Sequence, residues 1–379
     1  MGTGLEKPLL RILEVISTEC VACGLCEKAC QFLSRYGNPK QIADGFDLWD
    51  PARQDMAFGC NLCQLCTAVC PRGLDPAGMF LEMRREVVRN GTGDYREHRR
   101  VLRYERLGTS KRYSWYGLPE GCGTVFFPGC TLSGTRPESV FAFFAYLKTH
   151  IPNAGIVLDC CTKPSHDLGR QDFFESMFSE MKGFLLENNI RKILMACPNC
   201  YRVFKEYAPE MTVMTIYEFM AGDGIPSRTP TGETVSVHDP CALRFDETIH
   251  LAVRQLLTKQ GLRIEEMSHH GRKTLCCGEG GSACCVAPEL SEAWVMLRKR
   301  ETNGHRAYTY CAGCANRLKS IVSITHIIDL MFEPEKALRG KSRVSRAPMT
   351  YFNRLWLKRR FKKTLEASVT REREFTGAV

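Results

Sequence analysis

Apolar residues recur at helical spacing in four stretches of the second half of the chain. In each stretch they occupy positions i, i+3, i+4 and i+7, the spacing of a helix that buries one face. The first two stretches are 140–147 and 174–181, and the same arrangement returns at 249–256 and 290–297. The pattern therefore predicts two amphipathic helices that are repeated later in the chain.

Short β-rich runs flank these predicted helices. TVFFPGC (124–130) corresponds to VSVHDPC (235–241), and KILMA before Cys197 corresponds to AYTY before Cys311. The later helix of each copy ends at asparagine or glycine, residues suited to a left-handed helix stop. Strand, helix, strand, helix, strand in this order predicts a parallel sheet covered by helices, so we predict an α/β fold of two pseudo-symmetric parallel βαβ units.

Ten cysteines repeat at a fixed offset within these two units. Corresponding cysteines lie 111 to 116 residues apart, which indicates an internal duplication. Each group follows a predicted strand, where parallel sheets place their sites, so we expect five thiols to converge in each copy. Packing as small apolar side chains would explain one pair but not ten matched positions. The two sets are Cys130, Cys160, Cys161, Cys197 and Cys200, and Cys241, Cys276, Cys277, Cys311 and Cys314.

Eight further cysteines form two runs near the beginning of the chain, each spaced C-x2-C-x2-C-x3-C. In bacterial ferredoxins this run holds two [4Fe-4S] cubane clusters, and the fourth cysteine of each run serves the other cluster. Zinc prefers two separated C-x2-C pairs, and disulfides are disfavoured because residues 1–19 do not resemble a secretory signal. By position, the two ligand sets are Cys20, Cys23, Cys26 and Cys70, and Cys60, Cys63, Cys66 and Cys30.

Composition and charge define the remaining organisation. The mass of 42.9 kDa and 44% apolar residues suit two or three folded domains, and no window approaches the 18 apolar residues of a membrane span. The formal charge of +10 is concentrated in 338–363, which holds ten Lys or Arg and no Asp or Glu. We predict a helical ferredoxin-like domain with linker at 1–112, the two repeats at 121–225 and 233–335, and a basic C-terminal tail at 338–379.

The segment 348–363 mixes aromatic and basic residues. Such a helix can lie on an anionic membrane surface, dock on a partner protein, or be a solvated end. No nucleic-acid recognition motif accompanies the charge, so we expect no nucleic-acid partner. A G-x-G-x-x-G segment between strand and helix is also missing, so we expect a partner to supply nicotinamide or flavin chemistry.

The motifs FFPGC, HDPC, CCGEGG and the two CxxC pairs resemble the CCG (cysteine-rich) domain of the B-type subunit of heterodisulfide reductase. The ferredoxin-type segment resembles the C-type subunit, and residues 15–335 together are similar to the D-type subunit of this family. They also resemble the iron-sulfur subunits of anaerobic glycerol-3-phosphate dehydrogenase and glycolate oxidase. Two positions depart from the pattern: Thr162 stands where glycine is usual, and Ala242 stands where histidine is frequent.

The resemblance implies one or two noncubane [4Fe-4S] clusters, each held by a five-cysteine set and facing the other across a cleft. Two one-electron sites would match the two electrons that reduce a disulfide. It implies a cytoplasmic oxidoreductase subunit of anaerobic metabolism. Such a subunit can lie at the inner face of the membrane, and it would receive electrons from a flavoprotein or a ferredoxin. The alternative is a non-catalytic electron relay between a flavin dehydrogenase and a membrane quinone or cytochrome b partner.

Two side chains beside the second cysteine set are candidate proton donors. His238 and Glu279 both flank predicted ligands of the second repeat. For His238, a hydrogen bond into the turn is the favoured alternative. Three cysteines fall outside the scheme: we expect Cys122 in an interdomain loop, and Cys284 and Cys285 at a helix start.

Overall fold

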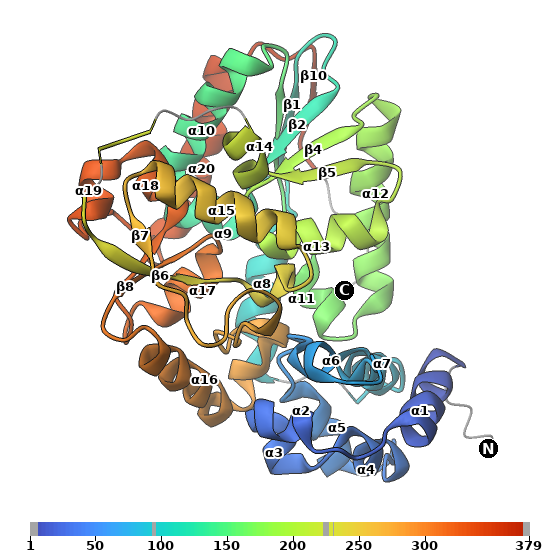
Figure 1. The fold of residues 1–379 in the computed structure, drawn as a ribbon. Coiled ribbons are helices and arrows are strands. Elements are labelled where there is room, and N and C mark those ends of the chain that lie inside the picture. Colours follow the sequence, from blue (N-terminus) through green and yellow to red (C-terminus); the bar gives the residue numbers. More distant parts are fainter. Residues whose placement is uncertain (1–6, 93–95, 223–226, 230, 374–379) are drawn as a thin grey trace.

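The computed structural model describes residues 7–92, 96–222, 227–229 and 231–373. A helical N-terminal segment lies against two α/β units, each built on its own sheet (Figure 1). The predicted domain limits at residues 1, 225 and 379 fall outside the described residues. None of the described helices is long and apolar enough to cross a membrane.

The N-terminal segment consists of short helices that carry the two cysteine runs. The runs are folded around α2 and α6, while the longer α1 and α7 contact each other beside them. Asn38 caps α4 through a reciprocal capping box with Gln41, and Asp75 caps α7. The helices are α1 (Lys7–Glu19), α2 (Leu25–Ala29), α3 (Gln31–Tyr36), α4 (Pro39–Asp44), α5 (Pro51–Phe58), α6 (Leu65–Val69) and α7 (Pro76–Arg89).

The first α/β unit contains a six-stranded sheet of order β10-β1-β3-β2-β4-β5. Its strands β3, β2, β4 and β5 are parallel, whereas β1 and β10 add an antiparallel edge. The strands are β1 (Trp115–Leu118), β2 (Thr124–Phe127), β3 (Gly155–Leu158), β4 (Lys192–Met195), β5 (Thr212–Thr215) and β10 (Val369–Arg371). The helices are α9 (Cys130–Thr135), α10 (Pro137–His150), α11 (Lys163–Asp167), α12 (Gln171–Glu187), α13 (Pro198–Tyr207) and α14 (Ile216–Gly222).

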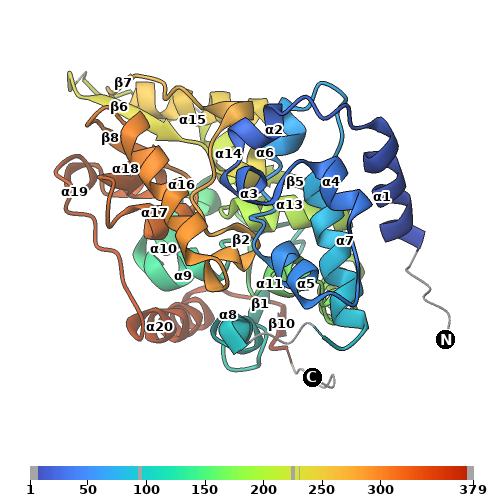
Figure 2. The same ribbon diagram turned by 90° about the horizontal axis from the view of Figure 1, so that it is seen from below.

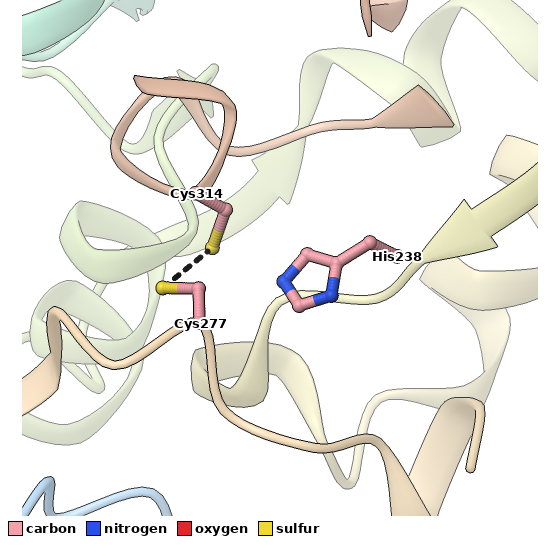
Figure 3. Close-up of side chains that lie close together, drawn as sticks. All are labelled: His238, Cys277 and Cys314. Carbon is pink, nitrogen blue, oxygen red and sulfur yellow. Dashed lines mark hydrogen bonds between the residues drawn. The ribbon is translucent and has the colours of Figure 1, made fainter. Parts of the chain in front are cut away.

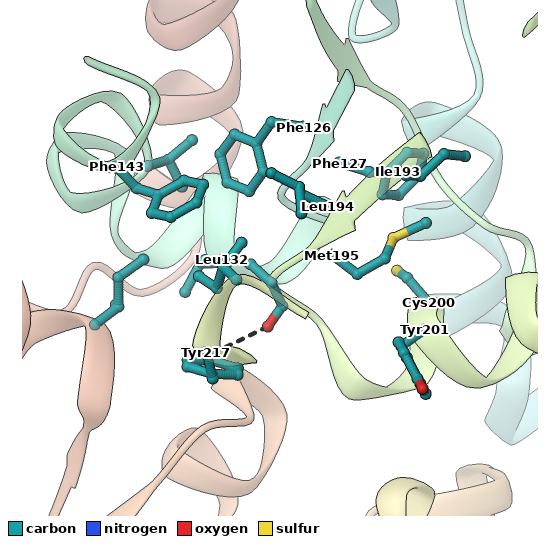
Figure 4. Packing of buried hydrophobic residues seen from close by; sticks show 14 of the residues in the cluster. Phe126, Phe127, Leu132, Phe143, Ile193, Leu194, Met195, Cys200, Tyr201 and Tyr217 are labelled. Atoms are coloured by element: carbon teal, nitrogen blue, oxygen red, sulfur yellow. Dashed lines mark hydrogen bonds between the residues drawn. The ribbon is translucent and has the colours of Figure 1, made fainter. Parts of the chain in front are cut away.

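Aromatic and aliphatic side chains fill the core of this unit. Phe126 of β2 packs on Phe143 of α10 with ring centroids 4.7 Å apart, and Phe127 packs on Phe204 at 5.4 Å (Figure 4). The buried hydroxyl of Tyr217 donates to the carbonyl of Ala196 at 3.1 Å. The helical faces expected at 140–147 and 174–181 are those that α10 and α12 bury, which confirms both predictions.

The second unit has a four-stranded parallel sheet of order β7-β6-β8-β9. The two sheets share one strand order. β2 lies between β3 and β4 in the first sheet, with β5 beyond β4, and β6 lies between β7 and β8 in the second sheet, with β9 beyond β8. The strands are β6 (Thr234–His238), β7 (Arg263–Ile264), β8 (Arg306–Thr309) and β9 (Ile324–His326). The helices are α15 (Glu247–Lys259), α16 (Pro288–Glu301), α17 (Ala312–Leu318), α18 (Ile327–Phe332) and α19 (Pro334–Leu338).

The expectation that every cysteine group directly follows a strand is wrong at one place. β7 has only two residues, and a long loop with the 3-10 turn η3 (Gly271–Lys273) separates it from Cys276 and Cys277. The buried carboxylate of Asp239 holds this loop, because it accepts the backbone N–H of Gly271 at 2.7 Å. A loop therefore delivers this cysteine pair where a strand does so in the first unit.

The N-terminal segment shares a core with the second unit. Trp294 and Leu290 of α16 belong to the same buried cluster as Phe32 and Phe80 of the N-terminal helices. Figure 2 shows α16 beside α3, and the two helices are in contact. This packing fixes the cysteine runs relative to the second sheet.

The basic segment at the end of the chain packs with one face on the first unit. α20 (Met349–Thr364) contacts α9, and Phe361 lies 5.1 Å from the Phe144 ring centroid. Arg354 and Lys358 are buried: Arg354 lies over the Tyr104 ring, and the ammonium of Lys358 donates to the Lys111 carbonyl at 2.6 Å. β10 then joins the first sheet beside β1, so residues 349–371 are built into this unit.

A buried carboxyl connects the linker helix α8 (Arg99–Gly108), which follows the turn η1 (Arg96–His98), to the first unit. Glu105 accepts the backbone N–H of Ser165 at 2.9 Å and also the Ser165 hydroxyl. Burial, the largest cause, raises the pKa of Glu105 from 4.5 to about 7. The folded protein therefore holds this proton at pH values where the unfolded chain has released it.

We expect the free energy of unfolding to fall by about 3 kcal/mol between pH 4.5 and 7 through this one group. Above pH 7 both states are ionised, and the contribution of Glu105 becomes constant. The Glu105→Gln variant, which keeps the shape of the side chain, should lose this part of the pH dependence. Urea unfolding at a series of pH values measures it; the same slope in both proteins would contradict the assignment.

Candidate metal centres

The first predicted ligand set surrounds a small cavity in the N-terminal segment. Cys20, Cys23, Cys26 and Cys70 line it, together with Cys66 of the other set. Ala22 and Gly24 have φ values of 50° and 75°, and Leu62 and Gln64 in the second run have 49° and 58°. Left-handed backbone is costly for residues other than glycine and persists where the surroundings demand it. Both runs therefore share a curl that turns their cysteines inward.

The second ferredoxin-type set is more deeply placed. Cys30, Cys60, Cys63 and Cys66 are all buried and line a cavity beside Trp294. Burial raises the pKa of Cys60 to about 12 and that of Cys30 well above its usual range. Thiols packed in this way resist ionisation on their own, whereas metal coordination deprotonates a thiol outright. The donor set fits an iron-sulfur cluster, which is held by four thiolates.

In the first α/β unit, five cysteines from three segments reach one cavity of about 490 Å³. Cys130 follows β2, Cys160 and Cys161 follow β3, and Cys197 and Cys200 begin α13 after β4. The thiols of Cys161 and Cys200 lie 3.3 Å apart. Gly129 has a φ of 77°, and a Cβ there would stand 2.9 Å from the Cβ of Cys197. Only glycine allows the two segments to approach so closely.

The second unit directs its cysteines to the same cavity. Cys241, Cys277, Cys311 and Cys314 line it, and the thiols of Cys277 and Cys314 lie 3.4 Å apart. Cys276 does not line this cavity but lies in the buried cluster that also contains Cys63 of the ferredoxin-type set. The neighbouring Cys276 thiol is the largest cause of a lowered Cys63 pKa, about 6. One thiol therefore connects the N-terminal segment with the second unit.

The two candidate proton donors occupy different places. A ring nitrogen of His238 and the sulfurs of Cys277 and Cys314 all lie within 4.8 Å of one another (Figure 3). His238 is buried with its ring beside the Cys277 thiol, and burial lowers its pKa. Glu279 lines the cavity, and burial raises its pKa to about 7.

The cysteines outside the two patterns lie away from the cavity. Cys122 is buried in the core of the first unit and its thiol donates to the Thr124 carbonyl at 3.3 Å. Cys284 and Cys285 end the 3-10 turn η4 (Gly280–Cys285), ahead of α16, and are partly exposed. None of the three is among the described residues that line the cavity.

Sequence patterns did not identify several side chains around these centres. Lys163 and Asp167 form a buried ion pair of 2.6 Å that lines the cavity, and Asp167 also contacts His166 at 2.9 Å. Arg84 and Arg244 are fully buried between the cysteine segments. The sequence around Arg84 and Arg244 does not indicate that they are buried, because both donate to backbone carbonyls of distant segments.

Comparison with known proteins agrees with this picture. Residues 19–75 match the model of a 4Fe-4S dicluster domain. The B-type subunit of the fumarate reductase (CoM/CoB) of Methanothermobacter marburgensis is 25% identical to the chain, over 83% of this chain and 72% of that protein. The D-type subunit of the dihydromethanophenazine:CoB-CoM heterodisulfide reductase of Methanosarcina barkeri is 24% identical, over 83% and 93%.

A third relative, the EtfAB:quinone oxidoreductase of Syntrophomonas wolfei, is 24% identical over 64% of this chain and 38% of its own length. The resemblance inferred from the cysteine motifs is thus confirmed by relatives that cover most of the chain. These relatives are named as subunits or members of oxidoreductase systems. The chain is an iron-sulfur oxidoreductase-type protein similar to the D-type subunit of heterodisulfide reductase, with a 4Fe-4S dicluster domain at residues 19–75.

Proposed function

We propose that this chain carries electrons from two ferredoxin-type clusters to one or two noncubane [4Fe-4S] clusters, where disulfide or thiol redox chemistry takes place. The observation that carries the proposal is the buried cluster in which Cys60, Cys63 and Cys66 pack together with Cys276. It links a predicted ligand of the dicluster segment to a predicted ligand in the second unit. Electron transfer between the two sets then needs no intervening partner.

The ligand sets in this proposal are those expected from the spacing. Cys20, Cys23, Cys26 and Cys70 would hold one cubane cluster, and Cys60, Cys63, Cys66 and Cys30 would hold the other. The two five-cysteine sets would hold the noncubane clusters, and such clusters supply one-electron transfer when bound. The matching strand orders and the fixed cysteine offset support an origin of the two units by duplication.

The cavity gives this chemistry a place. Nine of the ten repeated cysteines line this space of about 490 Å³, so both five-cysteine sets face it. A small thiol or disulfide in the cavity would meet both sets. Glu279 would lie within reach of the substrate, whereas His238 would contact Cys277 and Cys314 without lining the cavity.

Spectroscopy of the anaerobically purified protein tests the proposal. After oxidation, 3-mercaptopropionate and other small thiols are added and EPR spectra are recorded. A new thiol-dependent signal in the wild-type protein, lost in Cys277→Ala and retained in Cys122→Ala, would support thiol chemistry in the cavity. Cluster signals that no thiol changes would contradict the disulfide part of the proposal.

A second candidate function is an electron relay between a flavoprotein and a membrane quinone or cytochrome b partner. The relative named EtfAB:quinone oxidoreductase favours it, since its name joins a flavoprotein donor to a quinone. The outer face of α20 favours it as well: Met349, Phe352 and Trp356 are exposed there, with Arg359 and Lys363 on the same helix. Exposed apolar groups beside cations suit an anionic membrane surface.

We expect the full-length protein to sediment with phosphatidylglycerol-containing vesicles. The Phe352→Ser/Trp356→Ser double variant should bind at least about tenfold more weakly, because two large apolar side chains no longer enter the interface. Leu251→Ser, which alters an exposed residue of α15, is the control and should bind as the wild type does. Equal binding by all three proteins would exclude α20 as the contact surface.

A further inference from the structure

Arg244 occupies the junction between the ferredoxin-type segment and the second unit. It follows the turn η2 (Cys241–Leu243), and its side chain is buried, with 1% of the residue exposed. Its guanidinium donates three hydrogen bonds, all to backbone carbonyls: to Cys63 at 2.9 Å, to Arg272 at 2.7 Å and to Thr274 at 2.7 Å. One side chain thus joins the backbone of Cys63 to the loop that leads into Cys276.

Among the described residues, the guanidinium of Arg244 is bonded only to uncharged backbone carbonyls. No carboxylate of these residues forms an ion pair with it, although a buried guanidinium ordinarily needs compensation. Through the Cys63 carbonyl, the guanidinium lies directly against a segment that carries predicted ligands. A buried cation in this position fits a neighbouring group that carries net negative charge.

The surroundings of the first cysteine set differ. Cys23 is exposed, and Arg72, close in sequence to Cys70, forms an exposed ion pair of 2.6 Å with Glu19. Solvent and Glu19 therefore weaken the field of Arg72, whereas nothing comparable among the described residues screens Arg244. The two ferredoxin-type sets lie in unequal electrostatic environments.

We propose that Arg244 is a positioning residue that raises the reduction potential of the cluster held by Cys60, Cys63, Cys66 and Cys30. Reduction adds one electron and thus one negative charge, and a fixed buried cation stabilises this more negative state. The same guanidinium holds Cys63 against the loop of Cys276. Arg244 therefore favours electron transfer from the first ferredoxin-type set to the second. The inference rests on the proposed function, because it requires clusters at these cysteines.

The test is a redox titration monitored by EPR on the anaerobically purified full-length protein. The signal of this cluster is assigned by its loss in Cys60→Ala. In Arg244→Gln we expect the reduction equilibrium to shift at least tenfold toward the oxidised form, a decrease of about 59 mV for one electron. Arg244→Lys keeps the charge and should stay close to the wild type. Arg272→Gln removes an exposed cation from the adjoining loop and should also change little.

The outcomes separate the inference from the function on which it rests. If the wild-type protein binds no cluster at Cys60, the proposed function fails. If the cluster forms and Arg244→Gln titrates as the wild type does, the inference about Arg244 is wrong while the function stands. If Arg244→Gln cannot assemble the cluster, Arg244→Lys decides: a wild-type potential supports the role of the charge, and failure to assemble shows a structural role alone.

Discussion

Replacing Cys277 with alanine is expected to remove about a quarter of the bound iron, because a chain with four [4Fe-4S] clusters holds about sixteen irons. The thiol of Cys277 lies at the centre of the second set, 3.4 Å from that of Cys314 and within 4.8 Å of a His238 nitrogen. It is buried, and alanine would leave no donor atom in its place. Iron and sulfide analysis of the anaerobically purified variant measures the loss.

The chain provides a matched control in Cys122. This cysteine is also buried, but its thiol donates to the Thr124 carbonyl in the core of the first unit. Cys122→Ala should therefore keep the full iron content. The EPR signals of the two ferredoxin-type clusters should persist in Cys277→Ala, since none of their predicted ligands changes. If Cys277→Ala retained all of its iron, the five-cysteine set of the second unit would not be a cluster site.

The local fold could be predicted from the sequence where periodicity is strong. The expected face of 249–256 is the one that α15 buries. On α16, Leu290 and Trp294 are buried as expected, whereas Ala293 and Leu297 are only half-buried. The asparagines expected to stop helices, Asn189 and Asn303, have φ values of 60° and 48°. These features depend on a few neighbouring residues, so the sequence carries their signal directly.

The antiparallel edge of the first sheet could not be predicted in the same way. β1 and β10 pair through Tyr116 and Arg371, which are far apart along the chain, and neither run belongs to the repeated pattern. The basic segment 348–363 indicated an exposed surface, yet α20 buries Arg354 and Lys358. Arg354 and Lys358 contact aromatic rings and a carbonyl of distant segments, and the sequence around the two residues does not indicate these contacts.

The grouping of cysteines within each unit follows from their spacing, but the contact between Cys63 and Cys276 does not. It depends on how η4 packs against the second cysteine run. Cβ atoms on Gly280 and Gly281 would stand 2.4 Å from the Asn61 carbonyl oxygen and 2.7 Å from that of Cys60. The sequence shows the glycines of the CCGEGG motif, but it does not show that the backbone of Asn61 and Cys60 packs against them.

Replacing Arg84 with methionine should destabilise the protein more than any other change to an arginine at this junction. The fully buried guanidinium of Arg84 donates to five backbone carbonyls in three parts of the molecule. Methionine fills similar space but leaves these oxygens without that donor, at a cost of about 4 kcal/mol or more. We expect the midpoint of thermal unfolding, measured by circular dichroism, to fall by about 5 °C.

The loss should begin where Arg84 joins the parts of the molecule. Its acceptors are Ala57, Phe58 and Cys60 of the N-terminal segment, Asp167 of the first unit and Gly281 of the second. Without the guanidinium, the second cysteine run loses its attachment to both units, so protease cleavage after α5 should precede cleavage of either sheet.

Arg53→Met is the appropriate comparison, because Arg53 lies on α5 but forms only a partly exposed ion pair of 3.9 Å with Asp50. Such a pair contributes about 0–1 kcal/mol, so the midpoint should change by only about 1 °C. Equal midpoints for the two variants would show that the five carbonyls find other donors. The N-terminal segment would then be held mainly by the apolar contact between α3 and α16, and Trp294 would become the residue on which the attachment depends.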